Sequence, residues 1–91
     1  VGYADGYPRA LSGRGTVSLH GRPARVLGRV CMDQLLVDAT DTGAAVGDVA
    51  TLIGADGPER ITAEEAAEAA GTIANELLCR IGPRVPRVYL R

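Results

Sequence analysis

Short runs of alternating apolar and polar residues fill the first two thirds of the chain. In residues 16–20 the apolar side chains of Val17 and Leu19 point to one side, and Gly21 supplies a turn before a mainly apolar run over residues 23–30. This spacing predicts a β-hairpin. Further strands are expected where apolar runs lie between turn residues, over residues 35–38, 49–53 and 59–61.

The last third of the chain changes to a helical pattern. Thr62 and Glu65 have the spacing of a capping box, which predicts a helix through Ala70 with its alanines on one narrow face. A second short helix is expected over residues 73–80, before Gly82-Pro83. Residues 87–90, after Pro86, are expected to form a closing strand at a sheet edge.

Together these elements predict a mostly β fold. About six short strands joined by glycine and aspartate turns favour a small Greek-key-like β-barrel, with two short helices near the C-terminus. Because 91 residues suffice for one hydrophobic core but not two, residues 1–91 are expected to form one domain. The first residue is Val1, and no secretory signal is visible, so the chain is expected to be a piece of a longer protein.

Composition narrows the choice of partners. The chain is 46% hydrophobic and 23% charged, with a net charge of -1 and three tyrosines as its only aromatic residues. Without a strong positive charge or many stacking side chains, nucleic acids and membranes are poor partners. Cys31 and Cys79 lack the spacing of zinc or redox motifs, which predicts reduced, buried thiols in a cytoplasmic protein.

The chain has no lysine, and its ten permanently positive side chains are all arginines. A lysine amine forms a Schiff base with a carbonyl group, and a guanidinium cannot replace it. This chain therefore cannot attach a carbonyl cofactor covalently through a side chain.

Two segments concentrate polar groups. In GYADGYPR (residues 2–9), Asp5 could cap backbone amides while Tyr3 and Tyr7 cover the core, or the loop could present a phenol to a pocket. In GRVCMDQ (residues 28–34), each side chain has an ordinary structural interpretation. Met32 could fill a gap, and Cys31 could be a small apolar residue. Asp33 could be a turn or ion-pair residue, and Arg29 could be either a solvated strand residue or a clamp for a carboxylate.

In the order GYADGYPR, GRVCMDQ, VGDVATLIG, ITAEE, GTI and RVPRVY, the chain resembles the C-terminal domain of bacterial alanine racemases. The resemblance implies a longer enzyme with an N-terminal α/β barrel, which binds pyridoxal phosphate through a lysine. It also implies a head-to-tail homodimer in which this domain closes the partner subunit's active site. Both bases of the family, a lysine and a tyrosine, are expected before Val1. No catalytic, cofactor-binding or metal-binding role is therefore assigned to a residue of this chain.

The same resemblance places a substrate-binding position at Met32, through its backbone amide, with Cys31 and Asp33 beside it. Tyr3 and Arg29 match residues that line the family's access channel. Where many members have a tyrosine, this chain has Asn75. An amide there implies a roomier pocket that could hydrogen-bond the hydroxyl of serine.

The resemblance predicts that the intact protein interconverts L- and D-alanine and supplies D-alanine for the bacterial cell wall, whereas this chain alone is inactive. A serine or broad-specificity racemase is an alternative. A non-catalytic β-barrel binding module is an alternative of another class, because small barrels serve many functions. A piece that self-associates through an exposed apolar surface is a third.

Overall fold

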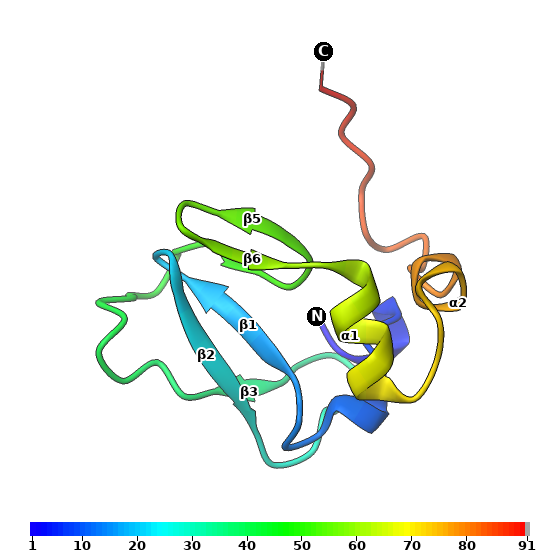
Figure 1. Cartoon of the computed structure of the whole chain (residues 1–91), viewed down its shortest axis with the longest axis horizontal. Coiled ribbons are helices and arrows are strands. Elements are labelled where there is room, and N and C mark those ends of the chain that lie inside the picture. The colour runs from blue at the N-terminus through cyan, green and yellow to red at the C-terminus, as the bar shows by residue number, and fades with distance from the viewer. Residues whose placement is uncertain (91) are drawn as a thin grey trace.

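The computed structural model describes residues 1–90, which form six short strands, two α-helices and two 3-10 helices (Figure 1). Four strands make one antiparallel sheet in the order β3-β2-β1-β4. This is the strand order of a Greek key. These strands are β1 (Thr16–Leu19), β2 (Arg22–Leu27), β3 (Leu36–Val37) and β4 (Ala50–Thr51).

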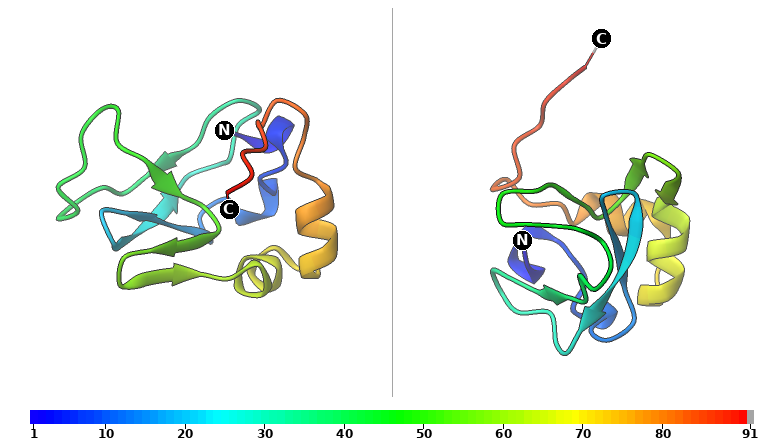
Figure 2. Two further views of the ribbon diagram at one scale, coloured as in Figure 1. Left: turned by 90° about the horizontal axis from the view of Figure 1, so that it is seen from above. Right: turned by 90° about the vertical axis from the view of Figure 1, so that its left-hand side faces the viewer.

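The sheet curls without closing. Figure 2 shows it wrapped around the first residues of the chain, and within residues 1–90 its edge strands β3 and β4 do not pair with each other. A separate two-stranded ribbon, β5 (Gly54–Asp56) and β6 (Glu59–Ile61), packs against β1. The predicted small, mostly β barrel of about six strands is confirmed, in the form of a half-barrel.

The β1–β2 hairpin has a two-residue turn. His20 and Gly21 both have positive φ, 51° and 70°, between the paired residues Leu19 and Arg22. Positive φ at both positions is typical of the type I′ turn, whose twist matches that of the strands. Asp56 fixes this turn, because its Oδ2 accepts hydrogen bonds from the Ser18 hydroxyl and the Gly21 N–H.

The core lies between the curled sheet and the 3-10 helix η2 (Arg9–Leu11). Its largest fully buried apolar side chains come from η2, β1, β2 and the segment just after β2: Leu11, Val17, Val26 and Val30. An apolar cavity of about 390 Å³ adjoins this core between Leu11, Leu52 and Leu77.

Both helices form close to their predicted positions. Helix α1 (Ala63–Ala70) starts after Thr62, whose hydroxyl accepts the Glu65 N–H, and ends at Gly71 with φ of 77°. Helix α2 (Ala74–Cys79) buries Leu77 and lies beside α1. None of the helices in residues 1–90 is long and apolar enough to cross a membrane.

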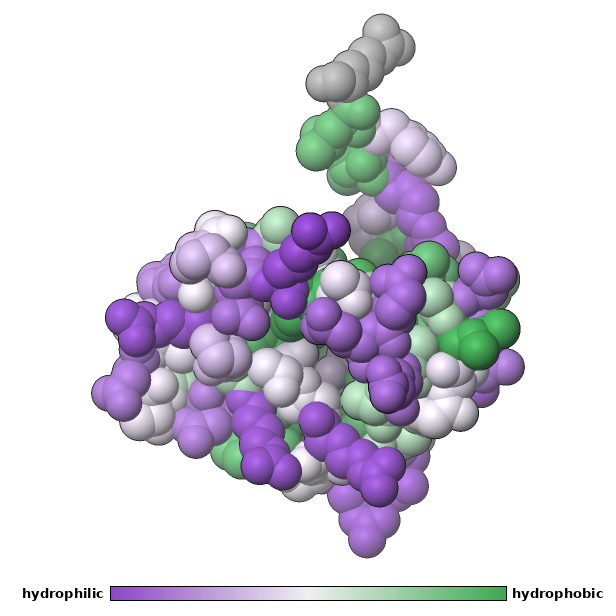
Figure 3. Space-filling model, in the orientation of Figure 1, coloured by the Kyte–Doolittle hydropathy of each residue, from purple (hydrophilic) through white to green (hydrophobic). Residues whose placement is uncertain are grey.

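Two predictions from the sequence are wrong. Residues 87–90 form no strand: Arg87 donates to carbonyls of Ile81 and Gly82, and the chain then leaves the body before it meets a sheet edge. Figure 3 shows apolar side chains of this segment standing clear of the surface. The cysteines are free but exposed rather than buried, because Cys31 follows the buried Val30 in a loop and Cys79 lies off the face of α2 that buries Leu77.

Candidate functional site

The two segments singled out in the sequence lie against each other. The 3-10 helix η1 (Tyr3–Asp5) packs on residues 31–34, which form a loop without regular secondary structure (the 31–34 loop). The backbone N–H of Tyr3 donates to the Cys31 carbonyl at 2.9 Å, and that of Ala4 donates to the Met32 carbonyl at 3.0 Å. Backbone hydrogen bonds between η1 and the loop therefore fix where Met32 lies.

Gly2 makes this close packing possible. A Cβ atom at Gly2 would lie 2.3 Å from the Cys31 oxygen and 2.5 Å from the Met32 oxygen, closer than real Cβ atoms approach. Since both neighbours are backbone atoms, no side-chain rotation can relieve the clash. The close packing of η1 on the loop therefore requires a residue without a Cβ atom at this position.

Within the 31–34 loop, the carbonyl groups and the amide groups face different partners. The Cys31 and Met32 carbonyls accept the bonds from η1, and the Cys31 N–H donates to the Gln34 carbonyl at 2.9 Å. Among residues 1–90, no acceptor is found for the Met32 N–H. Met32 is 54% exposed, so the residue that carries this donor lies at the surface.

Asp5 has the structural role that the sequence allowed. Its Oδ2 accepts the Gly2 N–H at 3.1 Å, and its Oδ1 accepts a charged hydrogen bond of 2.7 Å from Arg84 Nε. These bonds, that of Arg84 first, lower the pKa of the Asp5 carboxyl below its ordinary value. Tyr7 also follows the structural interpretation: it is buried in the core, and burial raises its pKa.

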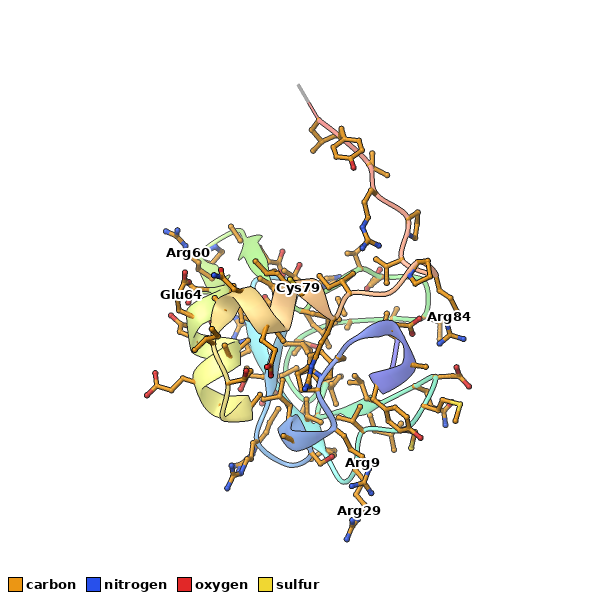
Figure 4. All side chains as sticks on the ribbon, turned by 90° about the vertical axis from the view of Figure 1, so that its right-hand side faces the viewer. Arg9, Arg29, Arg60, Glu64, Cys79 and Arg84 are labelled. Carbon is orange, nitrogen blue, oxygen red and sulfur yellow. The ribbon has the colours of Figure 1, made fainter. Side chains whose placement is uncertain are left out.

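Arg84 was missed by the sequence analysis. Besides Asp5, it binds Asp33, with 2.8 Å between Arg84 Nη2 and Asp33 Oδ1. The two carboxylates raise the pKa of Arg84 above its ordinary value. Figure 4 shows Arg84 beside η1, on the side away from α1. The motif RVPRVY contains it, but nothing in the spacing of that motif indicates partners so distant along the chain.

The predicted site residues are only partly brought together. Tyr3 and the three residues of the 31–34 loop are neighbours. Arg29 lies just before the loop and projects outward on the same side of the molecule as Arg9 (Figure 4). Asn75 lies on α2, and no hydrogen bond or ion pair in residues 1–90 joins it to the loop.

The predicted site residues all lie at the solvent-exposed surface of the domain. All six are exposed, and none lines the apolar cavity of about 390 Å³: Tyr3, Arg29, Cys31, Met32, Asp33 and Asn75. Tyr3 and the 31–34 loop thus lie on an open surface, which could become a closed site only when another surface covers it. Residues 1–90 also contain no cluster of three or more potential metal ligands.

Comparison with known proteins gives a consistent result. The sequence profile of the family described as "Alanine racemase, C-terminal domain" matches residues 1–89. The chain is 54% identical to an alanine racemase of Geobacter sulfurreducens over 92 residues, which cover 99% of this chain and 24% of that protein. It is 52% identical to an alanine racemase of Halothermothrix orenii, with 98% and 24% covered. The chain thus spans about a quarter of the length of these relatives.

Solved structures agree with the sequence comparison. A crystal structure of alanine racemase from the D-cycloserine producer Streptomyces lavendulae matches with a TM-score of 0.91 and 50% identity, covering 100% of this chain and 24% of that one. One from Bartonella henselae, with covalently bound pyridoxal phosphate, matches with a TM-score of 0.87 and 38% identity, covering 99% and 26%. The chain belongs to the alanine racemase family, where it corresponds to the C-terminal domain.

Proposed function

We propose that the longer protein to which this domain belongs interconverts L- and D-alanine, and that the 31–34 loop holds the substrate carboxylate. The observation that carries this proposal is the Met32 N–H, which has no acceptor within residues 1–90 and belongs to an exposed residue. A backbone donor fixed by neighbouring hydrogen bonds can bind a carboxylate without reorganising. Tyr3 and Arg29 would then lie at the rim of the site, with Cys31 and Asp33 on either side of the donor.

Pyridoxal phosphate would be held by another part of the longer protein. The Bartonella henselae racemase carries this cofactor covalently. The present chain has no lysine to attach it, so its residues do not fit covalent attachment. In this proposal the domain supplies substrate geometry, and the catalytic bases lie outside the chain.

The exposure of the whole candidate site supports a role in closing an active site. Exposed residues such as Tyr3 and those of the 31–34 loop hold a small zwitterion only when a second surface excludes water from them. We assign that second surface to the partner subunit of a head-to-tail homodimer in the cytoplasm. The D-alanine formed there would serve cell-wall synthesis.

The intact protein, loaded with pyridoxal phosphate, tests the role of Met32 through two substitutions. Met32→Ala keeps the N–H and is expected to change kcat/KM for L-alanine little. Met32→Pro removes the donor. Loss of a hydrogen bond to a charged group costs about 1.5–3 kcal/mol, so kcat/KM should fall by roughly 10- to 150-fold. Equal losses in both variants would contradict the role of the backbone donor.

The same preparation tests the reaction itself. Chiral chromatography should detect D-alanine formed from L-alanine. Absence of D-alanine in a cofactor-loaded, dimeric protein would instead favour the non-catalytic binding module.

A second candidate substrate is serine, which Asn75 favours. Its amide is exposed at the first turn of α2 and is free to hydrogen-bond a substrate hydroxyl. In the intact protein, Asn75→Tyr should lower kcat/KM for L-serine more than for L-alanine, because the amide partner is lost. Unchanged kinetics with L-serine would reject this substrate assignment and leave the alanine reaction standing.

A further inference from the structure

We infer that Arg84 is a positioning residue for the substrate carboxylate, acting on the 31–34 loop through Asp33. The inference rests on the proposed function of that loop and adds a residue from the far end of the chain. Within residues 1–90, the hydrogen bonds and ion pairs of the Arg84 side chain go to Asp5 and Asp33 and not to Met32. Arg84 would act by fixing the angle at which the Met32 N–H is presented.

The guanidinium of Arg84 joins two carboxylates from separate segments. Its Nε lies 2.7 Å from Asp5 Oδ1, and its Nη2 lies 2.8 Å from Asp33 Oδ1. Asp5 is itself tied to the start of η1 by the Gly2 N–H. Asp33 is therefore linked to the same rigid segment that already holds the Cys31 and Met32 carbonyls.

The Asp33–Arg84 ion pair is a further attachment of the 31–34 loop. The loop has no regular secondary structure, and its bonds to η1 involve only Cys31 and Met32. Beyond Met32, the Asp33 side chain provides the charged contact to the rest of the chain. The bonds to η1 hold the carbonyls on either side of the Met32 Cα, and the Asp33–Arg84 ion pair adds an attachment one residue further along, which limits movement of the loop as a whole.

The geometry also explains why the residue is an arginine. Two carboxylates are bonded through two different nitrogens of one planar group, which the single ammonium of a lysine cannot reproduce in the same directions. Both of these nitrogens are already occupied by Asp5 and Asp33. With two carboxylates on one guanidinium, the cluster has a net negative charge, so Arg84 is unsuited to binding the substrate carboxylate directly.

Propionate gives a readout that is separate from catalysis. It has the carboxylate and carbon skeleton of alanine but no amine, so its affinity reports the carboxylate contact without chemistry at the cofactor. Isothermal titration calorimetry on the intact, cofactor-loaded dimer would compare the unaltered protein with Arg84→Lys, Arg84→Gln and Asp33→Asn. Arg87→Gln is the matched control, because Arg87 lies in the same segment but donates to nearby backbone carbonyls.

We expect propionate to bind roughly tenfold more weakly in all three variants, since small displacements of a binding group have large effects. Arg87→Gln should bind as the unaltered protein does. The Arg84→Gln/Asp33→Asn double variant should lose no more than either single variant, because both remove the same attachment. In racemisation of L-alanine, KM should rise more than kcat falls.

Asp33→Asn keeps the test decisive if Arg84→Gln disturbs folding, because the Asp33 side chain is 64% exposed and has no role in the core. Unchanged propionate affinity in Asp33→Asn would overturn the inference. Additive losses in the double variant would also overturn it. Failure of the unaltered protein to bind propionate would instead reject the proposed function, and the positioning role with it.

Discussion

Replacing Gly2 by alanine tests whether the contact between η1 and the 31–34 loop sets the geometry of the site. Gly2 has an extended φ of -150°, which any residue adopts, so the effect of the substitution is steric. The new Cβ would lie 2.3 Å from the Cys31 oxygen, whereas ordinary contact begins near 3.4 Å. The two backbones must therefore separate by about 1 Å, the difference between these two distances.

This separation would stretch two backbone hydrogen bonds. They are 2.9 Å and 3.0 Å long, so an added 1 Å takes both beyond hydrogen-bonding distance. At about 0.5–1.5 kcal/mol each, their loss lowers the free energy of local opening by about 2 kcal/mol. That corresponds to roughly 30-fold faster amide hydrogen exchange at Tyr3 and Ala4. A displacement of this size would also reduce kcat/KM for L-alanine on the order of 100-fold.

Hydrogen exchange followed by mass spectrometry on the intact protein measures the opening of this contact directly. Gly82→Ala is the matched control, because a Cβ there would lie 3.4 Å from the Ala4 oxygen, an ordinary contact distance. Its exchange rates at Tyr3 and Ala4 should stay close to those of the unaltered protein. If Gly2→Ala exchanges no faster than Gly82→Ala, the steric argument is refuted.

Three further predictions concern the stability of the domain and the ionisation of its carboxyl groups. Because the pKa of Asp5 is lowered in the folded chain, its ionised carboxylate stabilises the fold. This contribution is fully present above the ordinary pKa of 3.8 and disappears as the pH falls through the lowered pKa. In acid unfolding, Asp5→Asn should therefore lose less stability with falling pH than the unaltered protein. Leu11→Ala should cost about 2–5 kcal/mol in opening free energy at β1 and β2 by hydrogen exchange, whereas Leu36→Ala, at an exposed position, should cost under about 0.5 kcal/mol. Ser18→Ala should raise the pKa of Asp56 toward its ordinary value in an NMR titration, because the Ser18 hydroxyl is the largest cause of its lowering; an unchanged pKa would reject that attribution.

The elements predicted correctly are those with signals close together in the sequence. The β1–β2 hairpin follows from alternation around Gly21, and α1 follows from Thr62 at its start and Gly71 at its end. The missed elements are too short for any periodicity to appear. They are η1, η2 and β5, each of three residues.

The site was predictable to the extent that family motifs mark it. They indicated Tyr3 and the 31–34 loop, which the structure places in contact through backbone hydrogen bonds. They gave no indication of Arg84, whose partner Asp5 lies 79 positions earlier in the chain. Because Arg84 and Asp5 meet only in the folded chain, no short-range spacing in the sequence indicates their ion pair. An arginine beside a proline can also have many other roles.

The 31–34 loop is distant in the sequence from both ends of the chain, but residues near both ends hold it in place. Residues 2–5 hold its backbone, and Arg84 holds its Asp33 side chain. Both contacts join segments that are far apart in the sequence, so they exist only once the chain between them has folded. The geometry of the Met32 N–H is therefore a property of the completed domain. In the proposed function, a domain without a catalytic base would still affect the rate, because a substitution at either end of the chain would reach the substrate carboxylate through the loop.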